Sequence, residues 1–522
     1  PRYVVEFLTD NTLGRIWYEM TKGETEMVDS CNYLVRRPTE IFLDEGREAP
    51  VGELSDEDIS QEELLKQPVY IPHRPLKDPR EIKMLDPACG SMHFGLYAFD
   101  LFERIYAEAW ELEEHLGSNA FQRLTHLETL HETYPDKTAY TRDVPRLIIE
   151  RNIHGVDIDP RAVQIAGLSL WLRAQKSWGV QGLHQQERPQ ISKSNIVCAE
   201  PMPGDQQMLD DFLNTLDEAR LETLLRESLH LPLYSRLRVT PAMADALKGL
   251  VRTVWNEMEL AGEAGSLLKI EKTLRDAITK ARKNSEEKSP LFQVLEYGIG
   301  SDDQTKLDFW DYAEILVLAA LQDYAEQAAS GASYQRRLFA GDAAQGFAFI
   351  QLCQKLYDVV LMNPPFGNAS KKALKYLAQL YKNWNKNVLC AFITRQNDLL
   401  TKNGFISSVI DRTILNKSTY EKFRRENFLD LNSLSQVLDL GWDVLDANVE
   451  VSSCIMGASS STNSNTICID VRQVSLEKKE NVLIESLSKD LGYKNIYLHL
   501  TNGFGFLPNA SIIYDLPNRL LQ

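Results

Sequence analysis

The 522-residue chain carries 43% hydrophobic and 25% charged residues, the ordinary composition of a globular protein. Its formal net charge of −17 at pH 7 argues against a protein that coats nucleic acid non-specifically. No apolar run reaches the roughly 18 residues that a membrane span needs. The seven cysteines are scattered and form no C-x-x-C pair, so we expect no metal site, no disulfide framework and a reducing, cytoplasmic compartment.

The N-terminal part predicts helix, linker and strand in that order. Apolar residues at helical spacing predict an amphipathic helix over residues 4–20, and the acidic residues 44–66 predict a linker or exposed loop. Residues 81–95, EIKMLDPACGSMHFG, predict a strand that runs into a glycine-containing turn, and residues 96–116 predict a helix. The chain opens on PRYVVEFLTD without an initiator Met or a secretory leader, so we expect it to begin inside a longer protein.

Two further segments have a strand followed by a turn. IHGVDI at 153–158 predicts a short strand, after which Pro160 can open a helix over 162–178. SKSNIVCAEPMPG at 192–204 predicts a second short strand that ends in a turn. Residues 205–334 have a helical pattern and few strand signals, so we expect a helical insertion there.

Strand signals resume after this insertion, at residues 336–343, 357–363, 404–410, 435–441 and 450–456. Residues 457–469 are rich in Ser and Asn and predict a hairpin turn or a mobile loop. Alternating strands and helices predict an α/β fold with a doubly wound, mainly parallel sheet covered on both faces. Ligands bind such sheets at the carboxyl ends of the strands. The segments LDPACGSMHFG, GVDIDP, NIVCAEP and VVLMNPPFG all fall there.

The first two of these segments have the features of a nucleoside site. The small residues of DPACGS, 86–91, let a ligand approach the backbone beside the N–H groups of the following helix. Asp157, at the end of the next strand, is placed to accept hydrogen bonds from both hydroxyls of a ribose. A helix cap before Pro160 is the alternative role for an aspartate here, and it suits Asp159 better.

The segment LMNPPFG, 361–367, predicts a stiff corner after a buried strand. Two prolines supply no backbone N–H, so the hydrogen-bond ladder stops there. The Asn363 side-chain oxygen and the Pro364 carbonyl can accept hydrogen bonds from an aromatic amine, and Phe366 can stack on its ring. The alternative is a corner that serves only as a turn.

These motifs, in this order and after PRYVVEFL, resemble the amino-group DNA methyltransferases that use S-adenosylmethionine, specifically the adenine-N6 group. DPACGSMHFGLYAFDLFERIYAEAWE and DVVLMNPPFG are most similar to BREX phage-defence methyltransferases of the PglX type, with type I and type II modification methylases more distant. The resemblance covers about residues 1–456. It implies an S-adenosylmethionine-dependent methyltransferase fold and methylation of the N6 amine of adenine in a phage-defence or restriction-modification system.

The resemblance also implies roles for single residues. The catalytic corner, which would receive an adenine flipped out of double-stranded DNA, is Asn363, Pro364, Pro365 and Phe366. The S-adenosylmethionine site is expected to comprise Pro1 and the helix after it, Asp86, Pro87, Ala88, Cys89, Gly90, the ribose acceptor Asp157, Ile158 against the cofactor's adenine, and Phe392. The residue at the adenine amine is either Glu200 or Asp342, and Glu200 has the better position. Met92 stands where the family usually has a glycine.

Other functions remain open from the sequence. The same corner occurs in enzymes that methylate RNA or protein glutamine, and the chain could also be a non-catalytic cofactor-binding scaffold of a defence complex with other defence proteins as partners. Residues 355–430 hold 13 Lys/Arg against 6 Asp/Glu, and this basic stretch favours DNA. Its Lys371, Lys372 and Lys375 contact phosphates or simply solvate a helix face.

We therefore expect five regions. They are a cofactor helix and acidic linker at 1–80, the first half of the methyltransferase core at 81–204, the helical insertion at 205–334, the second half of the core with NPPF at 335–456, and the start of a C-terminal region at 457–522. The last region is too short for a target-recognition domain, so we expect most of that domain to be absent.

Overall fold

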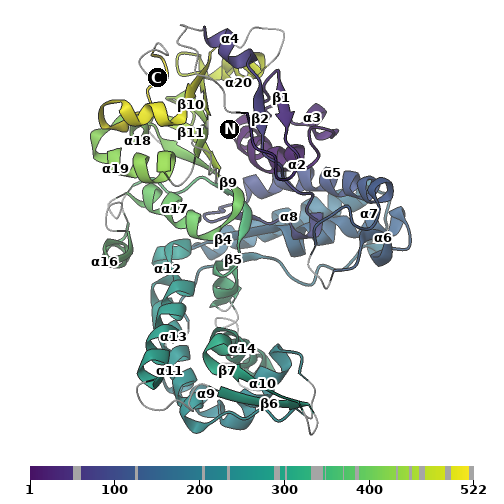
Figure 1. Ribbon diagram of the computed structural model, residues 1–522, viewed down its shortest axis with the longest axis vertical. Helices are drawn as coiled ribbons and strands as arrows, with labels where there is room; N and C mark the ends of the chain where they lie inside the picture. The colour runs from purple at the N-terminus through teal and green to yellow at the C-terminus, as the bar shows by residue number, and fades with distance from the viewer. Residues whose placement is uncertain are drawn as a thin grey trace. The chain divides into compact units, whose positions relative to one another are not determined.

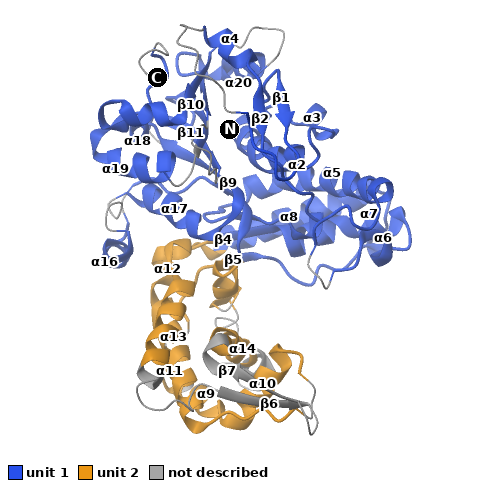
Figure 2. Cartoon of the chain, viewed as in Figure 1, with its two compact units in different colours: residues 1–156, 161–196, 356–522 blue, residues 157–160, 197–355 orange. Residues whose placement is uncertain are grey.

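The structure is a computed structural model, and Figure 1 shows its helices and strands along the chain. It describes residues 1–50, 60–123, 127–202, 206–231, 235–286, 294–299, 303–330, 345–346, 348–367, 369–381, 387–430, 433–445, 449–457, 465–487 and 495–516. The chain forms two compact units, coloured separately in Figure 2. The first comprises residues 1–156, 161–196 and 356–522, and the second comprises residues 157–160 and 197–355.

A nine-stranded sheet with the order β13-β12-β10-β11-β9-β8-β3-β4-β5 organises the first unit. Its strands are β3 (Met84–Asp86), β4 (Ile153–Asp157), β5 (Ile196–Cys198), β8 (Tyr357–Met362), β9 (Leu400–Asp411), β10 (Ser433–Gly441), β11 (Val451–Gly457), β12 (Asn465–Asp470) and β13 (Ile496–Leu500). β3 pairs in parallel with β4 and β8, and β8 with β9, whereas β11 runs antiparallel to β9 and β10. β8 is buried along its whole length, as its apolar run requires of a central parallel strand.

Helices of the N-terminal half cover one face of this sheet. They are α1 (Arg2–Thr9), the π-helical turn η1 (Asp10–Gly14), α2 (Arg15–Met20) and α5 (His93–Leu116). Phe7, Trp17 and Phe102 from these helices share one hydrophobic cluster with Ile153 of β4 and Leu361 of β8. The amphipathic helix predicted over residues 4–20 is thus confirmed, with a π turn in its middle.

The opposite face packs against α17 (Val388–Gln396), which contacts β9. Ile406 and Ile410 of β9 are fully buried but lie outside the first cluster, whereas Val409 belongs to it. Successive side chains of a strand point to opposite faces, so these isoleucines face away from α1 and α5. The predicted doubly wound, mainly parallel α/β sheet is confirmed.

The first unit also contains further helices and strands. They are α3 (Met27–Ser30), β1 (Glu40–Phe42), α4 (Gln61–Lys66), β2 (Val69–Ile71), α6 (Leu130–Thr133), α7 (Lys137–Leu147), α8 (Pro160–Val180), α16 (Lys371–Leu380), α18 (Thr413–Asn416), α19 (Glu421–Arg424) and α20 (Leu476–Leu487). α8 begins at Pro160, as predicted. The acidic segment predicted as a loop contains α4, because Ser60 and Glu63 form a capping box that starts a helix.

The second unit is mainly helical in the part of the chain that the structure describes. Its helices are α9 (Gln206–Thr215), α10 (Glu218–Ser228), α11 (Pro241–Glu257), α12 (Ala261–Ala264), α13 (Ile270–Glu286) and α14 (Phe309–Ser330). An antiparallel pair, β6 (Val294–Ile299) and β7 (Asp303–Asp308), is an addition that the sequence pattern did not predict, because β7 is mostly polar. The strand predicted at 336–343 lies outside the described residues.

The C-terminal residues continue the sheet. The hairpin turn or mobile loop predicted for 457–469 is wrong at its end, because residues 465–470 form β12. β12 pairs in parallel with β10 and not with β11, so no hairpin joins β11 to β12. Among the described helices, none is both long enough and apolar enough to cross a membrane.

Candidate active site

The carboxyl ends of neighbouring parallel strands carry the predicted motifs. β8, β3 and β4 are adjacent in the sheet, and the strand order reverses between β3 and β8. β3 ends at Asp86, β4 ends at Asp157, and Asn363 directly follows β8. A reversal of strand order is the place where open α/β sheets bind ligands.

The DPACG turn after β3 is held by one hydrogen bond within the turn and one to β4. The buried Asp86 carboxylate accepts the Ala88 N–H at 3.2 Å, and the Cys89 N–H donates to the Val156 carbonyl at 2.9 Å. Gly90 has a φ of 50°, and no atom lies within 4 Å of the position where a Cβ would stand. The turn therefore leaves open space directly over the Gly90 backbone.

The surroundings of Met92 explain how the turn accommodates a methionine at this position. It has a φ of 69°, a left-handed conformation that costs a non-glycine residue about 1 kcal/mol or more. Its side chain is fully buried, and a Cβ on Gly95 would lie 2.5 Å from the Met92 Cε. Gly95 thus makes room for the Met92 side chain, and burial of that side chain offsets the backbone cost.

Asp157, Ile158 and Glu200 belong to the second unit. The Asp157 carboxylate accepts the Asp159 N–H at 2.9 Å, and its carbonyl accepts the Ala199 N–H at 2.8 Å. Burial raises the pKa of the Cys198 thiol to about 12, with further contributions from the Glu200 and Asp157 carboxylates. Two of the predicted cofactor residues, Asp157 and Glu200, therefore act on the same thiol, that of Cys198.

Three other residues were predicted to belong to the cofactor site. Ile158 is 51% exposed, so it presents apolar surface next to the end of β4. Asp342, the alternative to Glu200, lies outside the described residues. Pro1 is exposed at the start of α1, whose Val4, Phe7 and Leu8 are buried.

The NPPF corner alternates buried and exposed positions. Asn363 and Pro365 are exposed, Pro364 is buried, and Phe366 is partly buried against the hydrophobic cluster of the first unit. Gly367 follows with a φ of 115°, and its carbonyl accepts the Val388 N–H at 3.3 Å. This bond ties the corner to the first turn of α17, which also carries the buried Phe392.

Two polar residues with a structural role were not singled out from the sequence. Asp10 and Asn11 are completely buried in the π turn η1, although the predicted helix there is amphipathic. The sequence signal that could have found Asp10 and Asn11 is their position in the amphipathic pattern of residues 4–20. The pattern puts these two adjacent polar residues next to the apolar face of the helix.

Comparisons with known proteins identify the family. Residues 151–444, more than half of the chain, match the family described as Eco57I restriction-modification methylase. The chain is 24% identical over 436 residues to the adenine-specific methyltransferase BrxX of Escherichia coli O9:H4 (strain HS), covering 81% of this chain and 27% of that protein. It is 24% identical over 176 residues to the adenine-specific methyltransferase PglX of Lacticaseibacillus casei (strain Zhang), covering 34% of this chain and 11% of that protein.

A solved structure is also similar. The ATP-dependent Type ISP restriction-modification enzyme LlaBIII bound to DNA matches with a TM-score of 0.36 and 10% identity, over 80% of this chain and 19% of that chain. The chain spans only a minor part of the length of each of these relatives. The predicted resemblance to BREX and restriction-modification methylases is confirmed by the family match and by BrxX and PglX, and the chain belongs to the Eco57I restriction-modification methylase family.

Proposed function

We propose that this chain is the methyltransferase part of an enzyme that transfers a methyl group from S-adenosylmethionine to the N6 amine of adenine in DNA, in a phage-defence or restriction-modification system. The observation that carries the proposal is the NPPF corner after β8, directly beside the DPACG turn after β3, in a chain of this methylase family. The names of BrxX and PglX, both adenine-specific methyltransferases, support the choice of adenine.

The residues at the strand ends fit the cofactor. The open space over Gly90 lets a ligand lie against the backbone, which suits the methionine part of S-adenosylmethionine. Asp157 would accept the ribose hydroxyls, and the exposed Ile158 offers an apolar surface to the adenine. We favour Glu200 as the residue that contacts the adenine amine, because the carboxylates of Glu200 and Asp157 both raise the pKa of the Cys198 thiol. Pro1, Asp86, Pro87, Ala88, Cys89 and Phe392 complete the proposed site.

The NPPF corner would activate the target amine. When bound, S-adenosylmethionine supplies the methyl group. The exposed Asn363 side-chain oxygen and the Pro364 carbonyl would accept the two amine hydrogens, which favours a tetrahedral nitrogen with its lone pair available. Because the buried Pro364 fixes the corner, both acceptors would be in place before positive charge builds on the nitrogen. Holding the amine in line with the methyl group adds a proximity contribution.

Phe366 would hold the flipped adenine. Its ring is partly buried against the hydrophobic cluster, so the ring is fixed and its remaining surface can stack on a base. Base stacking on an aromatic ring contributes about 1–3 kcal/mol, which is comparable to the few kcal/mol that extruding a base costs. Double-stranded DNA is therefore the proposed substrate, and other defence proteins are proposed partners.

The decisive experiment is the Asn363→Ala variant. We expect the rate of methyl transfer to DNA to fall by about 100-fold or more, the usual loss for one preorganised acceptor, while S-adenosylmethionine affinity is unchanged. Transfer of radiolabelled methyl groups to DNA, with identification of the methylated base, measures the first quantity, and calorimetry measures the second.

Asn403→Ala is the matched control, because Asn403 is also exposed and lies near the start of β9, which pairs with the start of β8. It should methylate at the wild-type rate. A wild-type rate in Asn363→Ala would show that the corner is only a turn. Labelled RNA or labelled protein glutamine in place of labelled adenine would instead favour the alternative substrates.

A further inference from the structure

Two buried side chains of the π turn tie the N-terminal helical segment, residues 2–20, to the next part of the chain. Asn11 donates to the Tyr33 carbonyl at 2.7 Å and accepts the Val35 N–H at 2.8 Å. Asp10 accepts the Tyr33 N–H at 3.1 Å. Together the two side chains form hydrogen bonds with the backbone of residues 33–35, as the edge of a neighbouring strand would. One of the two side chains, Asp10, can change its charge.

The Asp10 carboxyl has no exposed surface, and the hydrogen-bond donors recorded for it in the described residues are neutral. Its second oxygen accepts the Tyr97 hydroxyl of α5 at 2.7 Å, and the Cys31 thiol is a further hydrogen-bond partner. Burial outweighs these bonds and raises the pKa of Asp10 to about 7, and the Glu6 carboxylate adds to the rise.

The elements around Asp10 also carry charged groups. On α2, Arg15 is ion-paired with Glu19 and with Glu40. On α5, the positive charge of Arg104 acts on the Cys31 thiol, which is itself bonded to Asp10. β9, which also packs against the π turn, carries Lys402 and Asp411 near its two ends. Among the described residues, an ionised Asp10 has three neutral hydrogen-bond donors, the Tyr33 N–H, the Tyr97 hydroxyl and the Cys31 thiol.

We propose that Asp10 is a proton-controlled latch, which holds the N-terminal helical segment to α5 and to residues 33–35 more firmly when the carboxyl is protonated. A protonated Asp10 still accepts the Tyr33 N–H and can donate its own O–H to the Tyr97 oxygen. An ionised Asp10 must keep a full charge in a buried place where its hydrogen-bond donors are neutral. The latch is a property of the fold and does not depend on the proposed function.

The direction of the pH effect follows from linkage. When the segment opens, Asp10 meets water and its pKa returns to about 4. Between about pH 4 and pH 7 the closed form keeps a proton that the open form releases, so opening becomes easier as the pH rises. Above pH 7 both forms are ionised, and this group adds no further pH dependence.

Hydrogen exchange of the amides in residues 2–20, in the wild-type chain and in Asp10→Asn at the same pH, tests the latch. Asparagine can accept the Tyr33 N–H and donate to Tyr97 but cannot titrate. We expect the ratio of the opening constants, wild type over variant, to rise about tenfold per pH unit between pH 5 and pH 7 and to level off above pH 7. Comparison at equal pH cancels the intrinsic exchange rates.

Two further variants keep the test decisive. Asp29→Asn removes an exposed carboxylate of α3 and should leave the pH profile of the wild type unchanged. Tyr97→Phe removes a donor to the ionised form, so it should move the levelling-off to a higher pH, and this holds even if Asp10→Asn fails to fold. A ratio that stays constant from pH 5 to pH 8, or a Tyr97→Phe profile that coincides with the wild type, would overturn the proposal.

Discussion

Asp157 already uses one carboxylate oxygen within the protein, and this affects how its proposed contact with the ribose can be tested. The oxygen Oδ1 accepts the Asp159 N–H at 2.9 Å. Asp157→Ala removes this bond together with the proposed cofactor contact. Asp157→Asn keeps an acceptor oxygen for Asp159 and removes only the charge, so the two variants separate the local role from the binding role.

We expect S-adenosylmethionine affinity to fall in both Asp157 variants. Hydrogen bonds to a charged acceptor contribute about 1.5–3 kcal/mol, so Asp157→Ala should weaken binding by about 10- to 100-fold. Asp157→Asn should bind S-adenosylmethionine almost as weakly as Asp157→Ala, while its thermal stability stays near that of the wild type. Titration calorimetry measures the affinity, and unchanged affinity in Asp157→Asn would remove the carboxylate from the cofactor site.

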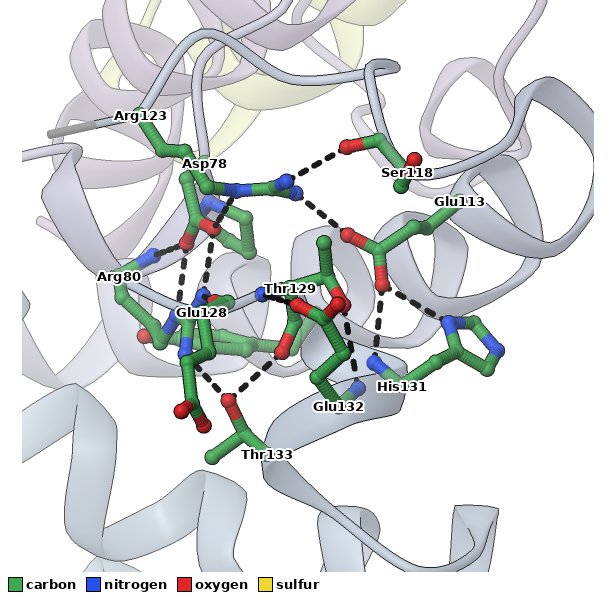
Figure 3. Close-up of polar contacts among 12 residues, drawn as sticks. Asp78, Arg80, Glu113, Ser118, Arg123, Glu128, Thr129, His131, Glu132 and Thr133 are labelled. Atoms are coloured by element: carbon green, nitrogen blue, oxygen red, sulfur yellow. Dashed lines mark hydrogen bonds and ion pairs between the residues drawn. The ribbon is translucent and has the colours of Figure 1, made fainter. Parts of the chain in front are cut away.

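At the scale of elements, a buried charge network joins the segment before β3 to α5 and α6. Figure 3 shows the Asp78 carboxylate between the Arg80 and Arg123 guanidinium groups, and Glu113 of α5 between Arg123 and His131. The side chains of Asp78 and Glu113 are 0% and 2% exposed. Arg123 also donates to the Ser118 carbonyl at 2.7 Å, so it links three parts of the chain.

Arg123→Ala should therefore destabilise the first unit strongly. Removing one partner from a buried charge network leaves carboxylates without full compensation, at a cost of about 3–5 kcal/mol. Lys137→Ala is the control, because its ion pair with Glu111 is about half exposed on both sides and should contribute about 1 kcal/mol or less. Denaturant unfolding of both variants measures the difference, and equal stabilities would show that the network contributes no more than a surface pair.

At the scale of the whole molecule, the net charge of −17 opposes association with DNA, so binding depends on local positive charge. Lys371, Lys372 and Lys375 are exposed on α16, the first helix after the NPPF corner. The sequence left open whether these lysines contact phosphates or only solvate the helix. The structure adds their exposure and their place directly after the corner.

The salt dependence of DNA binding distinguishes these roles. If all three lysines contact phosphates, replacing them by glutamine should reduce the slope of log K against log salt concentration by about 3. Replacing Lys22, Lys66 and Lys137 removes the same charge from exposed surface ion pairs and should leave the slope nearly unchanged. Equal slopes in the two triple variants would show that the α16 lysines only solvate their helix.

Part of the candidate site could be predicted from contiguous residues. The apolar run before Asn363 and the two prolines after it predict a buried strand that stops at the corner, because proline lacks the N–H that a ladder needs. The strands that end at Asp86 and Asp157 were also predicted from contiguous residues, and Pro160 correctly marked the start of α8. The roles of these residues stay predictions.

Other features depend on residues that are far apart in the chain or on local geometry that residue type alone does not set. The sequence by itself determined the α/β class, the strand ends and the order of the motifs, because periodicity and proline chemistry act within a few residues. Only the tertiary structure decided that β12 pairs with β10, that Gly95 makes room for Met92, and that Asp10 is buried against the Tyr33 N–H and the Tyr97 hydroxyl. Strand partners and burial are set by contacts between distant segments, which no local pattern contains.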